Sequence, residues 1–146
     1  MRYSESELIL MALEARKYAY TPYSNHKVGA ALLTKDGKVY TGCNIENIAY
    51  GPTNCAERTA FFKAVSEGER EFEAIAVVGG REDADKLDYF PPCGVCRQVM
   101  MEFCDYDNFQ IILAKTPDEY VEYKLSQIQP VAFGPQILEE GCDKNE

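Results

Sequence analysis

The chain has 146 residues, of which 46% are hydrophobic and 27% are charged, so one compact core is expected and disorder is excluded as the main state. Its 24 acidic and 15 basic residues give a net charge of -9, which argues against a nucleic-acid or membrane-surface partner. The apolar runs near the start are too short to span a membrane, and Glu5 and Glu7 stand where signal peptides are basic, so we expect a cytoplasmic protein.

Capping residues, turns and periodicity predict helices that alternate with strands. Ser4 and Glu7 form a capping box before the first helix, and an Asp-Gly pair at 36–37 predicts a hairpin. Branched apolar residues at 72–78 are typical of a strand buried on both faces, which Gly79 is expected to end. The expected elements are a helix at 4–18, strands at 28–33 and 39–45, a helix at 55–67, a strand at 72–78, a helix at 93–103, strands at 110–114 and 120–124, and a helical turn at 125–128.

This alternation predicts an α/β layered fold. The sequence contains no repeat, no low-complexity segment and no linker with a shift in composition. We therefore expect one domain over residues 1–135, followed by a polar, loosely held tail at 136–146.

Three of the six cysteines open predicted helices. Cys55 begins one helix, and a CxxC motif, Cys93 and Cys96, begins another. Helix N-termini stabilise thiolates, and two helices packed side by side would bring these three together. Three protein ligands without an obvious fourth are typical of a catalytic zinc, which keeps one position for water.

Other donors leave two alternatives open. Cys43 in a strand, Cys104 at a helix end or His26, the single histidine, would close a fourth position and make a zinc-stabilised interaction module. A thiol redox protein would use the CxxC motif alone, but it gives the Cys-Ala-Glu sequence at 55–57 no role. Cys142 falls in the expected tail.

Two residues beside Cys55 are candidates for the chemistry. Glu57, two positions later, would lie beside a metal held by Cys55 and handle the protons of its water, although an acidic residue also simply favours a helix N-terminus. Arg58 would offset the negative charge of three thiolates on one zinc, or it forms a surface ion pair.

Five segments together resemble the zinc-dependent cytidine deaminases, in their small, all-cysteine, homotetrameric form. The resemblance extends over roughly residues 8–135, and its motifs in this order are highly specific. It implies a three-layer α/β fold with a mixed five-stranded sheet packed by helices. The segments are VGAAL at 28–32, TGCNIEN at 41–47, CAERTA at 55–60, PCGVCRQ at 92–98 and VAFGP at 131–135.

The resemblance implies a role for each matching residue. Cys55, Cys93 and Cys96 match the zinc ligands, and Glu57 matches the glutamate that moves protons, with Arg58 next to the ligands. Asn44 and Glu46 match a pair that holds the ribose hydroxyls. The substrate-binding residues implied in all are His26, Asn44, Glu46, Ile48, Tyr50, Ala56 and Phe133, of which Ile48, Tyr50 and Phe133 would reach sites shared between subunits.

The implied activity is hydrolytic deamination of cytidine or 2′-deoxycytidine to uridine or 2′-deoxyuridine and ammonia, in pyrimidine salvage. Its cofactor would be Zn²⁺, its partner a small nucleoside rather than a nucleic acid, and its assembly a homotetramer. His26 stands where the family usually has a phenylalanine against the pyrimidine, and Ile48 is bulkier than the usual residue. These departures leave open a deaminase of a modified nucleoside.

Overall fold

A mixed sheet of five strands forms the centre of the structure, a computed structural model that describes residues 2–139. The strands are β1 (His26–Thr34), β2 (Val39–Cys43), β3 (Phe72–Arg81), β4 (Gln110–Thr116) and β5 (Glu119–Lys124). They lie in the order β2-β1-β3-β4-β5. β3 and β4 are parallel and the other neighbouring pairs are antiparallel, so the expected mixed sheet is confirmed.

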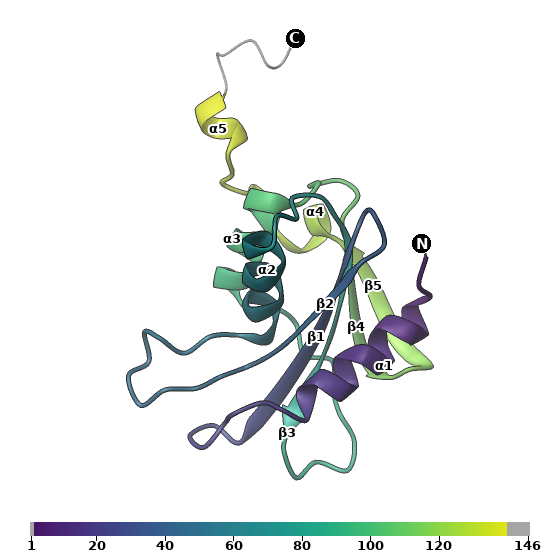
Figure 1. The fold of residues 1–146 in the computed structure, drawn as a ribbon, viewed down its shortest axis with the longest axis vertical. Helices are drawn as coiled ribbons and strands as arrows, with labels where there is room; N and C mark the ends of the chain where they lie inside the picture. Colours follow the sequence, from purple (N-terminus) through teal and green to yellow (C-terminus); the bar gives the residue numbers. More distant parts are fainter. Residues whose placement is uncertain (1, 140–146) are drawn as a thin grey trace.

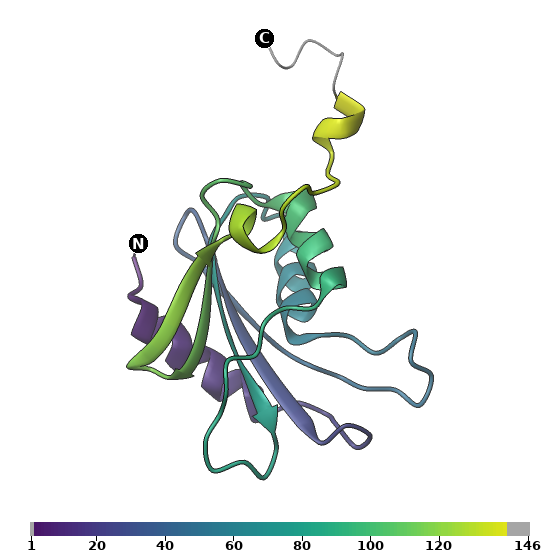
Figure 2. The same ribbon diagram turned by 180° about the vertical axis from the view of Figure 1, so that it is seen from behind.

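Helices cover both faces of this sheet and make three layers (Figures 1 and 2). The helices are α1 (Glu5–Arg16), α2 (Ala56–Ser66), α3 (Gly94–Phe103), α4 (Leu125–Ile128) and α5 (Gln136–Glu139). On the α1 side, Leu8 packs in one apolar cluster with Leu33. On the α2 and α3 side, Phe61 packs in a second cluster with Leu32. Adjacent residues of β1 thus face opposite layers, which confirms the three-layer α/β prediction.

The first helix begins where the sequence predicts but ends earlier. Ser4 Oγ accepts a hydrogen bond from the Glu7 backbone N–H at 3.1 Å, and Glu7 Oε1 accepts one from the Ser4 N–H at 2.7 Å, so the capping box is formed. The helix stops at Arg16 rather than at residue 18, and Tyr18 lies in the following turn, 74% exposed.

Gly79 does not end β3, contrary to the sequence prediction. The strand continues to Arg81, which pairs with His26. A Cβ atom on Gly79 would lie 2.8 Å from Cγ of Phe90 and 3.0 Å from Cγ2 of Val28. The glycine therefore serves close packing within the strand, and it lets the Phe90 ring lie directly on the sheet.

The second strand ends at Cys43, two residues before its expected end, because Asn44 turns to the neighbouring strand. Its Oδ1 accepts a hydrogen bond from the Val28 N–H at 2.9 Å, and its Nδ2 donates to the His26 carbonyl at 2.8 Å. These two hydrogen bonds hold the start of the segment between β2 and α2 against β1.

Gly42 allows the first turn of α2 to lie against β2, where a Cβ atom would lie 2.7 Å from the Ala60 backbone nitrogen and closer still to the Ala56 carbonyl. Because both contacts are backbone, Gly42→Ala is expected to lower the free energy of unfolding by about 1–3 kcal/mol. Denaturant unfolding of the two proteins measures this loss. Gly51→Ala is the control, since no atom lies within 4 Å of the added methyl group; equal stability of Gly42→Ala and the native chain would contradict the close approach.

The described chain ends in α5, which extends away from the body of the structure (Figures 1 and 2). The tail expected at 136–146 thus begins with a helical turn, and the rest of it, with Cys142, lies outside the described residues. Within residues 2–139, no helix has the length and apolar character needed to cross a membrane.

Candidate active site

Two helices begin at cysteines whose sulfur atoms lie close together. Cys55 is the N-cap of α2 and Cys93 the N-cap of α3, and neither thiol caps its own helix. Cys96 lies in the first turn of α3 and is buried. The Cys55 and Cys93 Sγ atoms are 3.7 Å apart, as are those of Cys93 and Cys96, and all three lie within 4.8 Å of one another. The packing of α2 beside α3 therefore gathers three thiols at two positive helix ends.

The spacing of the sulfur atoms fits a zinc ion. A tetrahedral zinc with Zn–S bonds of about 2.3 Å places its sulfur ligands about 3.8 Å apart. In the described part of the chain, no fourth cysteine, histidine, aspartate or glutamate joins the cluster; Cys43, Cys104 and His26 are not in it. Three thiolates and one open position are the arrangement of a catalytic rather than a closed structural site.

The cluster favours a thiolate at Cys55. A hydrogen bond with Cys96 lowers the pKa of Cys55 to about 5, with hydrogen bonding from Arg58 acting in the same direction and burial acting against it. The same contact with Cys55 and burial raise the pKa of Cys96. Both thiols must be deprotonated when their sulfur atoms bind a divalent cation.

Arg58 supplies a positive charge at the cluster. Its Nη2 donates a hydrogen bond to Cys55 Sγ at 3.1 Å. Burial lowers the pKa of Arg58, but its hydrogen bonds and charge attraction with Cys55 and Cys96 raise it by more, so the guanidinium stays ionised. Three thiolates around Zn²⁺ carry a net charge near -1, which this guanidinium offsets.

Glu57 is a buried carboxyl group beside the cluster. It lies in the first turn of α2 and only 3% of it is exposed. Burial raises the pKa of Glu57 to about 7, and the negative charge of Cys55 adds to this effect. Such a carboxyl can both accept and give a proton near neutral pH, which a general acid and base requires.

A cavity of about 320 Å³ adjoins the thiols and Glu57, and this volume suits a small molecule. Four segments form it: the start of β1, the segment after β2, the start of α2 and the segment before α3. His26, Asn44, Glu46 and Ala56, expected to bind substrate, all line it. The lining residues are Ser24, His26, Val28, Asn44, Glu46, Thr53, Asn54, Cys55, Ala56, Glu57, Phe90, Pro91 and Cys93.

The carboxylate of Glu46 is fixed by the turn that precedes β1. Its Oε1 accepts hydrogen bonds from the backbone N–H groups of Tyr23 at 3.0 Å and Ser24 at 3.1 Å, and its Oε2 accepts one from Ser24 Oγ. Burial works to raise the pKa of Glu46, but these hydrogen bonds outweigh it and lower the pKa. Glu46 is therefore an ionised, oriented acceptor at the cavity wall.

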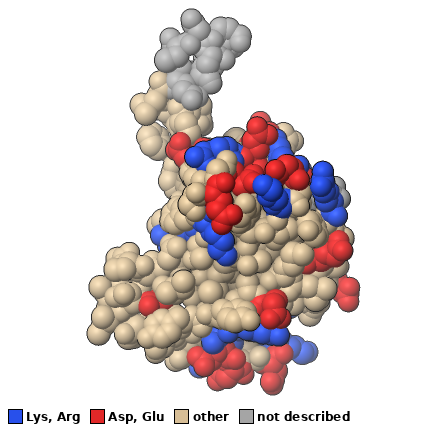
Figure 3. Space-filling model, in the orientation of Figure 1, with Lys and Arg blue, Asp and Glu red and all other residues tan. Residues whose placement is uncertain are grey.

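Ile48, Tyr50 and Phe133 do not line this cavity. Ile48 is 78% exposed, Tyr50 85% and Phe133 65%. Ile48 and Tyr50 belong to the segment between β2 and α2, which projects from the body as a largely uncharged lobe on the left of Figure 3. Their place in a neighbouring subunit's site stays a prediction.

Sequence reasoning missed six residues of the cavity, and Phe90 and Ser24 are two of them. Phe90 supplies an aromatic wall, and it lies on Gly79 of β3. Its position just before the Pro-Pro pair that leads to Cys93 was the available signal. Ser24 links Glu46 to His26, because its hydroxyl donates to Glu46 and accepts from the His26 N–H at 3.1 Å. No sequence pattern distinguishes this serine from an ordinary turn residue.

Comparison with known proteins identifies similar chains. The profile of the family described as "Cytidine and deoxycytidylate deaminase zinc-binding region" matches residues 2–111. The chain is 49% identical over 132 residues to the cytidine deaminase of Sporosarcina psychrophila, covering 90% of this chain and 93% of that protein. It is 53% identical over 126 residues to that of Halalkalibacterium halodurans, covering 86% and 91%. The crystal structure of cytidine deaminase from Burkholderia pseudomallei superposes with a TM-score of 0.81 at 46% identity, covering 90% of this chain and all of the other.

Proposed function

This chain belongs to the cytidine and deoxycytidylate deaminase zinc-binding family, and we propose that it hydrolyses cytidine and 2′-deoxycytidine to uridine, 2′-deoxyuridine and ammonia. The observation that carries this proposal is the buried carboxyl of Glu57 beside three convergent thiols at the end of one cavity. Neither a closed zinc module nor a thiol redox protein gives that carboxyl a function.

Cys55, Cys93 and Cys96 would hold the zinc ion, and Arg58 would offset their charge. When bound by three protein ligands, zinc lowers the pKa of a water in its open position toward about 7. Cys55 and Cys93 stand at helix N-termini, whose N–H groups and dipoles favour negative charge beside them.

Glu57 moves the protons of the reaction. Its carboxylate takes a proton from the attacking water as the water oxygen bonds to C4, and passes it to N3 of the pyrimidine. It then transfers the remaining hydroxyl proton to the amino group. The C4–N bond breaks, ammonia leaves, and the C4 carbonyl of the uridine product forms. The burial that raises the pKa of Glu57 to about 7 suits both directions of transfer.

The cavity walls orient the nucleoside. Ala56 is the first residue of α2, so its backbone N–H has no partner within the helix and is available to the base. Asn44 and Glu46 are fixed on β1 and on the turn before it, and their remaining lone pairs and N–H group serve the ribose hydroxyls. His26 would lie against the base.

The direct experiment incubates the zinc-loaded protein with cytidine. Loss of cytidine absorbance, with uridine and ammonia formed in equal amounts, is the expected result. Stable binding of zinc without any turnover of cytidine would instead favour the interaction module. Turnover of a modified nucleoside, with cytidine unchanged, would contradict the proposed substrate.

We further propose a homotetramer with shared active sites that acts in the cytoplasm, in pyrimidine salvage, without a nucleic-acid partner. Three large apolar side chains are exposed: Ile48 and Tyr50 on the largely uncharged lobe, and Phe133 near the C-terminal segment. Their exposure supports subunit contacts at these places. The net charge of -9 suits a neutral nucleoside better than a polyanion.

Sedimentation is expected to give a tetramer even at the lowest protein concentration at which activity is measured. The reason is that residues of neighbouring chains would complete each active site. Phe133→Ala is expected to raise KM, since a side chain 65% exposed in one chain gains its contacts only across an interface. A fully active monomer would contradict the shared sites, and a normal KM in Phe133→Ala would remove that residue from them.

A further inference from the structure

His26 is held in place by hydrogen bonds on both its backbone and its ring. Its N–H donates to Ser24 Oγ at 3.1 Å, and its carbonyl accepts from Asn44 Nδ2 at 2.8 Å. The ring Nδ1 atom lies 2.8 Å from the Ser24 carbonyl oxygen. The Ser24 hydroxyl donates in turn to Glu46. The ring therefore has a defined orientation at the wall of the cavity that it lines.

The contact at Nδ1 selects one tautomer of the ring. A carbonyl oxygen only accepts hydrogen bonds, so Nδ1 must carry the proton. In the neutral imidazole, the other nitrogen, Nε2, then carries a lone pair. His26 thus offers the cavity a hydrogen-bond acceptor, which a phenyl ring at the same place cannot do.

The nearby polar side chains already make most of their possible hydrogen bonds within the protein. Glu46 accepts three hydrogen bonds from the turn at 23–24, and the Asn44 amide binds β1 through both its oxygen and its nitrogen. Among the described residues 2–139, only Nδ1 of the His26 ring has a hydrogen-bond partner, and no protein group donates to Nε2. This atom is therefore left for a ligand.

We propose that His26 is a specificity-determining residue whose Nε2 accepts a hydrogen bond from a sugar hydroxyl of the nucleoside, an inference that rests on the proposed function. With C4 of the base at Cys55 and Glu57, the sugar extends to the polar group formed by Asn44, Glu46 and His26. Because the Nε2 lone pair lies in the plane of the ring, this bond leaves the ring face free to lie against the base.

The tautomer is tested without turnover by ¹⁵N nuclear magnetic resonance of the zinc-loaded protein. The chain has one histidine, so its two ring nitrogens give the only imidazole signals. At a pH where the ring is neutral, Nδ1 is expected to be protonated and Nε2 unprotonated, and the Nε2 signal is expected to shift when uridine is added. A proton on Nε2, or an Nε2 signal unchanged by saturating uridine, would overturn the proposal.

The hydroxyl is identified by kinetics on cytidine and its 2′-deoxy, 3′-deoxy and 5′-deoxy analogues. For one analogue, the wild-type protein is expected to lose about three- to tenfold in kcat/KM, the size of one uncharged hydrogen bond, while His26→Phe shows no such loss for it. Zinc content and melting midpoint of His26→Phe verify its fold. Equal losses in both proteins for all three analogues would contradict the role of His26, whereas a wild-type protein inactive on cytidine would contradict the proposed function itself.

Discussion

Glu57→Gln is expected to lower turnover of cytidine by at least about 10²–10⁴-fold, the contribution of a positioned general acid and base. The amide has nearly the same size as the carboxyl group, but it cannot take a proton from water. The fold is expected to be unchanged, because burial already works against the charged form of Glu57 and raises its pKa to about 7, so the neutral amide removes no favourable charge from the interior.

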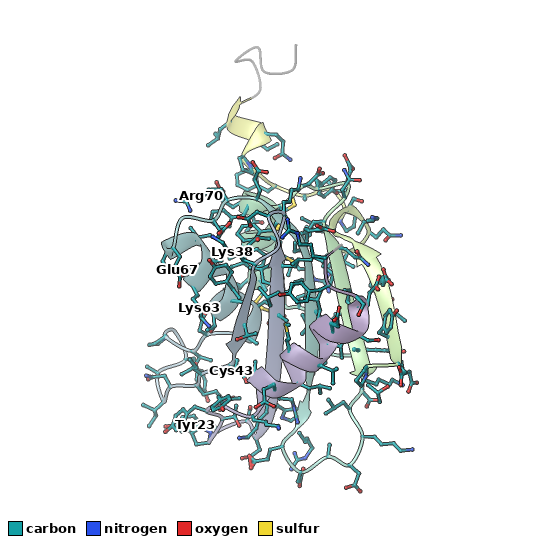
Figure 4. All side chains as sticks on the ribbon, turned by 45° about the vertical axis from the view of Figure 1, so that its right-hand side comes forward. Tyr23, Lys38, Cys43, Lys63, Glu67 and Arg70 are labelled. Carbon is teal, nitrogen blue, oxygen red and sulfur yellow. The ribbon has the colours of Figure 1, made fainter. Side chains whose placement is uncertain are left out.

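The measurement is kcat on cytidine, with zinc content and melting midpoint determined on the same samples. Glu67→Gln is the matched control, because Glu67 is exposed, follows α2 at its other end and does not line the cavity. In Figure 4 it is labelled far from Tyr23, whose backbone N–H binds Glu46 of the cavity. Only Glu57→Gln should lose activity. Near-normal turnover in that variant would leave Glu57 with no role beyond favouring the helix N-terminus.

The layers of the fold were predicted well because the capping and apolar patterns of the sequence mark the same segments that form helices and buried strands. The capping box at Ser4 and Glu7 and the apolar run at 72–78 are local patterns, and both describe what forms. The strand ends were predicted less well. Gly79 reads as a strand end in the sequence, but its role depends on Phe90, which is distant in the chain and packs on it.

Part of the candidate site was also predictable, because it depends on a pattern that is local in the sequence. Cysteines at the starts of two helices form a local pattern, and the structure brings their sulfur atoms together. The network from Glu46 through Ser24 to His26 was not predictable, because it joins a turn before β1 to the segment after β2. Nor does a sequence show which ring nitrogen of His26 carries the proton, since the backbone geometry of Ser24 decides it.

Each of the variants Cys55→Ser, Cys93→Ser and Cys96→Ser is expected to bind much less zinc than the native chain, which is expected to bind about one ion per chain. Each variant is also expected to lose all activity. A serine hydroxyl stays protonated at neutral pH and binds zinc far more weakly than a thiolate. Cys93 is the most informative position, because its side chain is exposed and its replacement costs little packing. Metal analysis after gel filtration, together with circular dichroism for the fold, measures the effect.

Cys43→Ser and Cys104→Ser are the controls and are expected to keep about one zinc per chain. Burial raises the pKa of both thiols, and neither lies at a helix N-terminus that would stabilise a thiolate. Cys43 lies at the end of β2 and Cys104 at the end of α3, and neither joins the cluster within the described residues. Zinc kept by the Cys93 or Cys96 variant, or lost from a control, would contradict a site of three thiolates, because in that set each sulfur supplies a third of the protein's bonds to the metal.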